Sequence, residues 1–245
     1  DIAPGLTLTQ DVGSVIDGGN SLMKRGLGTM VLNGTNAVTG LFVAEGVLQI
    51  NGQASLGDPA TTSSFSFGSD QTLGGASAGT RYTGGTVRIN FTGATNRGMV
   101  FNNNGNTNFS GGIDITAGNT FTLNGAASQG TEFDFGFKTG AGTLVTTATN
   151  TMRSFVMANG TWQFGNAAPW ANSTATTTDN TFIEMMGGTI SALNTGANIA
   201  LANNLSTTNY NYGGGMHLRM GSGGGFSIEF AADNLLRQNQ GTLVL

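Results

Sequence analysis

The sequence contains no cysteine and little charge. Without cysteine the fold has neither disulfides nor thiolate metal ligands, so burial and backbone hydrogen bonds must stabilise it. Charged residues make up 9% of the 245 residues, well below the roughly 25% of an ordinary soluble domain. With two lysines, seven arginines and a net charge of −4, the chain lacks the basic surface that binds nucleic acid or an anionic membrane.

Proline and long apolar runs are also scarce. Three prolines beside 41 glycines exclude a collagen repeat, because collagen needs both residues in a strict period. No run of about 18 apolar residues occurs, so we expect no membrane insertion by this segment. The chain opens at Asp1 without a basic leader, and we expect it to be part of a longer protein.

A short phrase recurs along the chain: glycine, threonine and then an apolar strand. Apolar and polar residues alternate within it, as where Val87 and Ile89 flank Arg88, which is typical of a strand with one buried face. Asn-Gly follows several strands, and we expect Asn33-Gly34, Asn51-Gly52 and Asn124-Gly125 to supply the positive φ angles of tight turns. The phrase begins at Gly28, Gly85, Gly142, Gly160, Gly188 and Gly241, and a near variant without threonine begins at Gly46.

The spacing of these phrases distinguishes two all-β architectures. The steps from Gly28 to Gly46 and from Gly142 to Gly160 to Gly188 are short enough to approximate one coil of a parallel β-helix each. Two longer and equal intervals, on either side of Gly85, would fit two to three coils each. We therefore expect residues 1–245 to form a single β-solenoid of about ten to twelve coils. An antiparallel β-sandwich is the alternative, because Asn-Gly also marks hairpins.

Residues 23–58, MKRGLGTMVLNGTNAVTGLFVAEGVLQINGQASLGD, resemble the autotransporter-associated β-strand repeat. That family opens with Lys-x-Gly-x-Gly-Thr, continues through Asn/Ser-Gly and Asn-x-x-Thr-Gly, and closes with a Gly-x-Leu strand and Leu-Gly. Residues 59–245 carry only degenerate versions of the pattern. The residues in register are Lys24, Gly26, Gly28, Thr29, Leu32, Gly34, Asn36, Thr39, Gly40, Val43, Gly46, Leu48, Ile50, Ser55, Leu56 and Gly57.

The resemblance implies a right-handed parallel β-helix in an extracellular or bacterial cell-surface protein. It implies no active site, because the shared residues are turn and core positions. We therefore expect a structural protein and not an enzyme, with no cofactor. The expected partners are copies of the chain itself, packed into a fibre or layer, or an adhesive contact with glycans or a host or neighbouring cell.

Two sets of residues favour a carbohydrate-directed alternative. Glu132 and Asp134 project from one face of a strand, opposite three phenylalanines, and form the best carboxylate pair for acid–base work on a polysaccharide. Trp170 follows Pro169 and would offer an exposed ring to a sugar, whereas Trp162 alternates like a core residue. His217 is the only histidine, and no nucleophile-elbow motif accompanies it.

Overall fold

The computed structural model describes residues 1–57, 60–67, 84–101, 110–129, 135–150 and 154–164, followed by residues 182–185, 188–192, 199–201, 204–206, 216–220, 228–230 and 243–244. These parts are almost entirely β-structure. The helical segment within them is one 3-10 turn, η1 (Gln53–Leu56). The chain is therefore an all-β protein, as the sequence predicts.

Three sheets contain most of the strands. In spatial order, the nine-stranded sheet contains β1 (Thr7–Thr9), β3 (Thr29–Leu32), β5 (Val47–Ile50), β7 (Thr86–Ile89), β10 (Ser110–Ile115), β13 (Phe135–Thr139), β15 (Ser154–Met157), β17 (Phe182–Met185) and β20 (Asn204–Ser206). The seven-stranded sheet contains β23 (Leu243–Val244), β21 (Met216–Met220), β18 (Thr189–Ala192), β16 (Thr161–Phe164), β14 (Thr143–Thr146), β11 (Thr120–Leu123) and β8 (Gly93–Thr95). The five-stranded sheet contains β12 (Ala127–Gln129), β9 (Met99–Phe101), β6 (Phe65–Phe67), β4 (Leu41–Val43) and β2 (Leu22–Lys24), and a separate pair joins β19 (Ile199–Leu201) to β22 (Ile228–Phe230).

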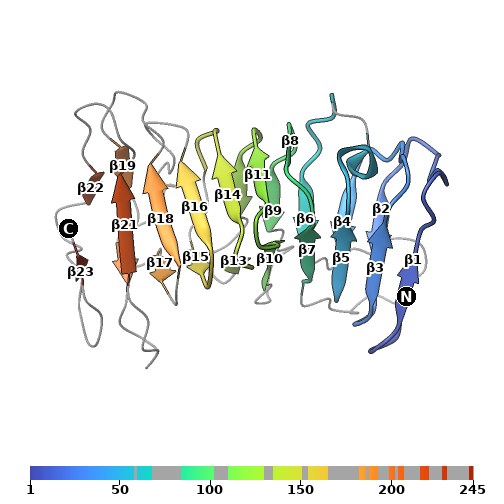
Figure 1. Ribbon diagram of the computed structural model, residues 1–245, viewed down its shortest axis with the longest axis horizontal. Coiled ribbons are helices and arrows are strands. Elements are labelled where there is room, and N and C mark those ends of the chain that lie inside the picture. Colours follow the sequence, from blue (N-terminus) through green and yellow to red (C-terminus); the bar gives the residue numbers. More distant parts are fainter. Residues whose placement is uncertain are drawn as a thin grey trace.

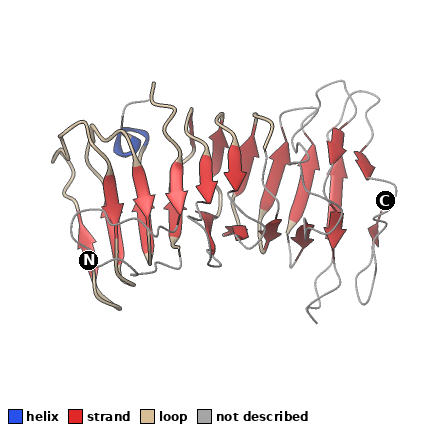
Figure 2. Ribbon diagram, turned by 180° about the vertical axis from the view of Figure 1, so that it is seen from behind, coloured by secondary structure: helices blue, strands red, loops and turns tan. Residues whose placement is uncertain are grey.

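The strands lie side by side in a long row that follows the sequence, with β1 at one end and β23 at the other (Figure 1). Viewed from behind, strands again lie side by side along the length of the molecule (Figure 2). Every strand pair in the described residues is parallel. The antiparallel β-sandwich is therefore wrong, because hairpin-connected strands would pair antiparallel.

The short strand spacings predicted from the sequence are confirmed by the register. Thr29 lies opposite Val47. These residues follow Gly28 and Gly46, so the pairing reproduces the predicted step between the two glycines. Thr143 lies opposite Thr161, and Thr161 in turn faces Thr189. The chain thus returns to the same sheet at the predicted intervals.

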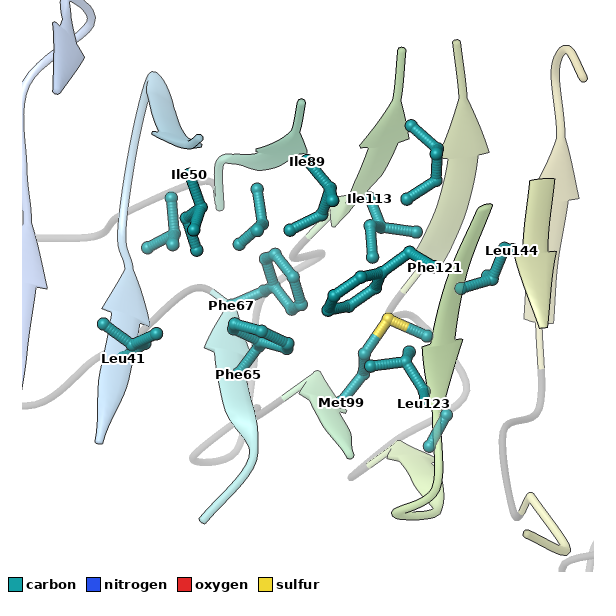
Figure 3. Packing of buried hydrophobic residues seen from close by; sticks show 14 of the residues in the cluster. Leu41, Ile50, Phe65, Phe67, Ile89, Met99, Ile113, Phe121, Leu123 and Leu144 are labelled. Carbon is teal, nitrogen blue, oxygen red and sulfur yellow. The ribbon is translucent and has the colours of Figure 1, made fainter. Parts of the chain in front are cut away.

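Alternation of buried and half-buried residues places one face of each strand in the core. Val87 and Ile89 are fully buried and Arg88 between them is not, and Phe121 and Leu123 flank the half-buried Thr122 in the same way. Buried side chains from opposing sheets meet in one continuous apolar cluster (Figure 3). Burial of each large side chain contributes about 1.5 to 3 kcal/mol.

Asn33-Gly34, Asn51-Gly52 and Asn124-Gly125 do not play their expected role. In the described residues only glycines have positive φ, and Gly34, Gly52 and Gly125 are not among them. Positive φ instead occurs at glycines just before strands, including Gly46 and Gly84. Gly34 and Gly125 are needed for close packing, because a Cβ there would overlap backbone atoms of neighbouring segments.

The Gly-Thr phrase also changes sheet along the chain. Thr29 and Thr86 begin strands of the nine-stranded sheet, whereas Thr143 and Thr161 begin strands of the seven-stranded sheet. The two longer intervals on either side of Gly85 are therefore not equivalent. The first joins two strands of one sheet, and the second crosses from one sheet to another.

Candidate functional site

The predicted carbohydrate-site residues lie outside the described residues. Glu132 and Asp134 immediately precede β13, and Trp170 follows β16. Their roles stay predictions. His217 lies in β21 with its backbone in register with Thr189 and Val244.

Trp162 is a core residue and not a sugar platform. Its side chain is fully buried, and its indole Nε1 donates to Thr146 Oγ1 at 3.0 Å. The rings of Phe155 and Phe164 lie 4.3 Å and 4.8 Å from it, centroid to centroid. This position agrees with the alternation seen in the sequence.

No group of three or more His, Asp or Glu side chains in the described part of the chain is placed to hold a metal ion. In the same residues, no helix is long and apolar enough to cross a membrane. The polar groups that are drawn together here are two lysines, one arginine and a series of amides. They define the candidate sites described below.

The first lysine corner links β2 to β3 and consists of residues 24–28 together with Glu45 and Gly46. Lys24 is 1% exposed, and its Nζ donates to the carbonyl oxygens of Arg25 at 3.0 Å, Gly26 at 2.5 Å and Glu45 at 3.1 Å. Glu45 also accepts a hydrogen bond from the Gly26 N–H through Oε2 at 3.2 Å. The ammonium therefore ties its own turn to the next turn along the row.

The second lysine corner links β13 to β14 and repeats this arrangement with residues 138–142, Asn159 and Gly160. Lys138 is fully buried, and its Nζ donates to the carbonyl oxygens of Thr139 at 2.8 Å, Gly140 at 2.6 Å and Asn159 at 3.0 Å. Both corners carry Lys-x-Gly-x-Gly-Thr, at residues 24–29 and 138–143. The first copy belongs to the family resemblance described above. The second was missed, although the spacing of the motif would have identified it.

Glycine is required twice in each lysine corner. Gly26 and Gly140 have φ of +76° and +72°, a region that L side chains rarely adopt. Gly46 and Gly160 lie over the lysine in the next turn, also with positive φ, and a Cβ at either would overlap two glycine carbonyl oxygens and the lysine Nζ. The glycines thus let three carbonyl groups converge on one ammonium.

Burial changes the acidity of both lysines. It lowers the pKa of Lys138 to about 8, and the Asp114 carboxylate opposes this shift. Burial also lowers the pKa of Lys24, against the opposing charge of Glu45. At neutral pH Lys138 is protonated, which supplies the three N–H donors that its three acceptors use.

Arg97 is a third buried cation bound by carbonyl groups. The side chain is fully buried, and Nη1 donates to the carbonyl oxygens of Thr39 at 2.6 Å and Ser63 at 2.8 Å. Nη2 donates to those of Val38 at 2.9 Å and Leu56 at 3.0 Å. The planar guanidinium therefore joins segments 34 to 59 residues distant in sequence.

Side-chain amides form a ladder across the ends of the first strands of the nine-stranded sheet. Asn33 Nδ2 donates to the Gln10 carbonyl oxygen at 2.9 Å, and Asn51 Nδ2 donates to Asn33 Oδ1 at 2.7 Å. Asn90 Nδ2 donates to Asn51 Oδ1 at 3.3 Å, and Asn90 Oδ1 accepts from Thr116 Oγ1 at 2.9 Å. This amide ladder explains why asparagine follows these strands.

A shorter ladder lies at the ends of the seven-stranded sheet's strands. Asn124 Nδ2 donates to Asn96 Oδ1 at 3.3 Å, and Thr147 Oγ1 donates to Asn124 Oδ1 at 2.9 Å. Amide stacking thus occurs at positions that were expected to form tight turns.

The N-terminal end of the row exposes apolar side chains and a strand edge. β1 is the last strand of the nine-stranded sheet, pairs with β3 alone in that sheet, and is exposed at all three residues. Leu8 is opposite Met30, on the core side of the sheet, yet 55% of it is exposed. Leu6, Val12, Val15 and Leu27 are exposed as well, at 57% to 84%.

Comparison with known proteins does not assign the chain to a family. No protein-family model matches it, and searches of curated proteins and of solved structures also give no match. The resemblance of residues 23–58 to the autotransporter-associated repeat therefore stays a prediction that rests on those residues alone.

Proposed function

We propose that the chain is a right-handed parallel β-helix that serves as a structural rod and associates end to end with copies of itself. The all-parallel pairing supports the helix, because parallel strands require crossovers and these are right-handed in nearly all proteins. The nine strands of the longest sheet, with β23 one level beyond β21, give ten levels. That number lies within the expected ten to twelve coils.

The single observation that carries the proposal is the exposed edge of β1 among the residues described. Leu8 begins a column of core residues that continues through Met30, Leu48 and Val87. Another strand that paired with β1 would bury the exposed end of this column. The exposed N–H and C=O groups of an edge strand are a template for such pairing. The low charge of the chain provides little repulsion against that contact.

The interior interactions support a rod whose levels are tied to one another. Both lysine corners, Arg97 and the amide ladders connect one level to the next along the row. Each connection adds polar specificity to the apolar stacking, because a shifted register would leave these buried groups without partners. This construction and the resemblance of residues 23–58 support the proposal of a structural role on a bacterial surface or in an extracellular fibre or layer.

Light scattering and electron microscopy over a range of protein concentrations test the proposal. We expect particle length to grow with concentration in the wild-type chain. Leu8→Lys should reduce this growth, because an edge lysine must be desolvated when another strand pairs there. Thr122→Lys adds the same charge on the outer face of β11 and is the matched control, with growth unchanged.

Two results would overturn the proposal. One is a wild-type chain that stays monomeric at every concentration. The other is a Leu8→Lys variant that associates like the wild type, which would place the contact elsewhere than the β1 end.

A further inference from the structure

The Asn159-Gly160 dipeptide in the second lysine corner combines a side-chain amide with an activated backbone nitrogen. The Gly160 N–H donates to Asn159 Oδ1 at 2.7 Å, which holds the carboxamide next to that nitrogen. Asn159 is exposed to solvent, and Gly160 has φ of +76°. Glycine presents no side chain to hinder its own nitrogen.

Lys138 acts on the same peptide unit. Its Nζ donates to the Asn159 carbonyl oxygen at 3.0 Å, and that oxygen shares the peptide bond with the Gly160 nitrogen. When the nitrogen loses its proton, negative charge spreads onto the oxygen. A charge-assisted hydrogen bond from the ammonium stabilises this anion and so raises the fraction of the nitrogen that is deprotonated and able to attack.

We propose that Asn159-Gly160 is a site of spontaneous backbone modification that Lys138 promotes. The Gly160 nitrogen gives its proton to water and forms a bond to Asn159 Cγ. Nδ2 takes a proton from water, the Cγ–Nδ2 bond breaks, and ammonia leaves behind a succinimide ring. One water molecule then adds to either ring carbonyl, whose bond to the Gly160 nitrogen breaks as that nitrogen regains a proton. Addition at Cγ gives aspartate, and addition at the former backbone carbonyl gives isoaspartate.

The other described Asn-Gly dipeptides lack this combination. The amides of Asn33, Asn51 and Asn124 are bound into the ladders, which hold each carboxamide through inter-strand hydrogen bonds. The Gly34 N–H donates to Gln10 Oε1 instead of to its own asparagine. None of these dipeptides has a lysine ammonium on its peptide carbonyl among the hydrogen bonds of the described residues.

The first lysine corner provides a natural comparison. Lys24 Nζ donates to the Glu45 carbonyl oxygen at 3.1 Å, and Gly46 follows with φ of +66°. The backbone is thus activated in the same way, but glutamate carries no amide nitrogen that could leave. Changing Glu45 to asparagine should therefore install the reaction at this corner.

Either product alters the second lysine corner. Aspartate and isoaspartate both place a carboxylate beside Lys138, and isoaspartate also lengthens the backbone between β15 and β16 by one carbon. Because the reaction is spontaneous, the modified form would accumulate with the age of the protein. It would change the backbone at a point where two sheets meet.

The experiment is peptide mapping by mass spectrometry of the whole folded chain during incubation near neutral pH. Each event replaces NH2 with OH and raises the mass by about one dalton, and isoaspartate is separated from aspartate by chromatography. We expect Asn159 to react about tenfold or more faster than Asn33, Asn51 or Asn124. Equal rates at the four sites in the wild-type chain would overturn the proposal without any variant.

Two variants test the role of the lysines. Lys138→Met, a residue type that already occupies the aligned position 157, should lower the Asn159 rate about tenfold, whereas an unchanged rate in a folded variant would contradict the proposal. Glu45→Asn should make the substituted position as reactive as Asn159. A folded Glu45→Asn variant in which that position reacts no faster than Asn51 would also contradict it.

The pH profile separates the charge of Lys138 from a purely structural role. Deamidation accelerates with pH, but the advantage of Asn159 over the other sites should shrink above about pH 8, where Lys138 loses its proton. Asp114 on β10 faces Lys138 and is paired with Arg88, while β14, β15 and β16 bring no charged residue. An advantage that is constant across this range would exclude the ammonium as its cause.

Discussion

At the scale of single residues, the buried cations donate hydrogen bonds to backbone carbonyls. Arg97 donates to four carbonyl oxygens from three separate segments. Removal of a buried cation leaves its acceptors unsatisfied, and each unsatisfied buried group costs about 1 to 3 kcal/mol. The cations therefore define how the segments are placed.

We predict that Arg97→Met lowers the free energy of unfolding by about 3 to 5 kcal/mol. Arg97→Lys should not restore it, because an ammonium cannot span four acceptors as a planar guanidinium does. Urea unfolding followed by circular dichroism measures both. Arg25→Ala is the control: its ion pair with Asp1 is partly exposed, at 28% and 67% of the two side chains, so the loss should be smaller, about 1 kcal/mol or less.

Lys138 gives a prediction about pH. Folding lowers its pKa from the ordinary 10.5 to about 8, so between these values the unfolded chain binds more protons than the folded chain. The free energy of unfolding should therefore increase as pH rises from about 8 to 10.5, and Lys24 contributes in the same direction. The increase should be smaller in Lys138→Met. If the wild type instead loses stability relative to the variant across this window, the pKa of Lys138 is raised in the folded chain. The hydrogen bonds to the carbonyls would then outweigh the effect of burial.

At the scale of elements, the backbone conformation of the glycine turn before a strand determines where the strand begins. We predict that Gly46→Ala lowers the free energy of unfolding by about 2 kcal/mol or more, because its φ is +66° and a Cβ would overlap backbone carbonyls. Gly52→Ala is the matched control. Gly52 has an extended φ of −165° and no atom near its Cβ position, so alanine should change stability by less than about 0.5 kcal/mol.

Thermal or urea unfolding of the two alanine variants measures the difference. Similar losses at both positions would mean that glycine serves chain flexibility in general. A loss confined to Gly46 would mean that glycine is needed there because carbonyl groups converge at the first lysine corner.

The strands were predictable from the sequence because their signal is local. Alternation within three or four residues determines which side chains face the core, as at Val87, Ile89 and Phe121. The role of asparagine after the strands was not predictable in this way. Asn33 and Asn51 bond to each other across 18 residues, and that contact exists only once the register is known.

Arg97 illustrates the same limit more strongly. Nothing in its immediate sequence distinguishes it from an exposed arginine, and its acceptors lie up to 59 residues away. Lys138 is an intermediate case. Its motif is local and complete, but the burial of the lysine itself does not follow from the neighbouring residues: Lys138 is buried in the core, whereas Phe137 beside it is only half-buried.

At the scale of the whole molecule, each level contacts its neighbours in the row, so stability should vary along it. We predict that amide hydrogen exchange in dilute solution is at least about tenfold faster in β1 than in β7 and β10, which lie inside the nine-stranded sheet. Mass spectrometry of peptic peptides measures this. Uniform exchange from β1 to β10 would indicate that the row opens as one unit.

The change of sheet along the chain could not be predicted from the sequence for a related reason. The Gly-Thr phrase predicts that a strand starts, but not which side of the molecule it joins. That choice depends on the intervening segments: β8 and β11 begin the seven-stranded sheet, and β12 ends the five-stranded sheet. Identical phrases therefore begin strands in different sheets.

One consequence concerns direction around the long axis. The first lysine corner lies where the five-stranded sheet meets the nine-stranded sheet, and the second lies where the nine-stranded sheet meets the seven-stranded sheet. Two copies of the same motif therefore occupy different corners of the cross-section. A substitution in the first corner and one in the second thus loosen different sheet junctions of the same rod.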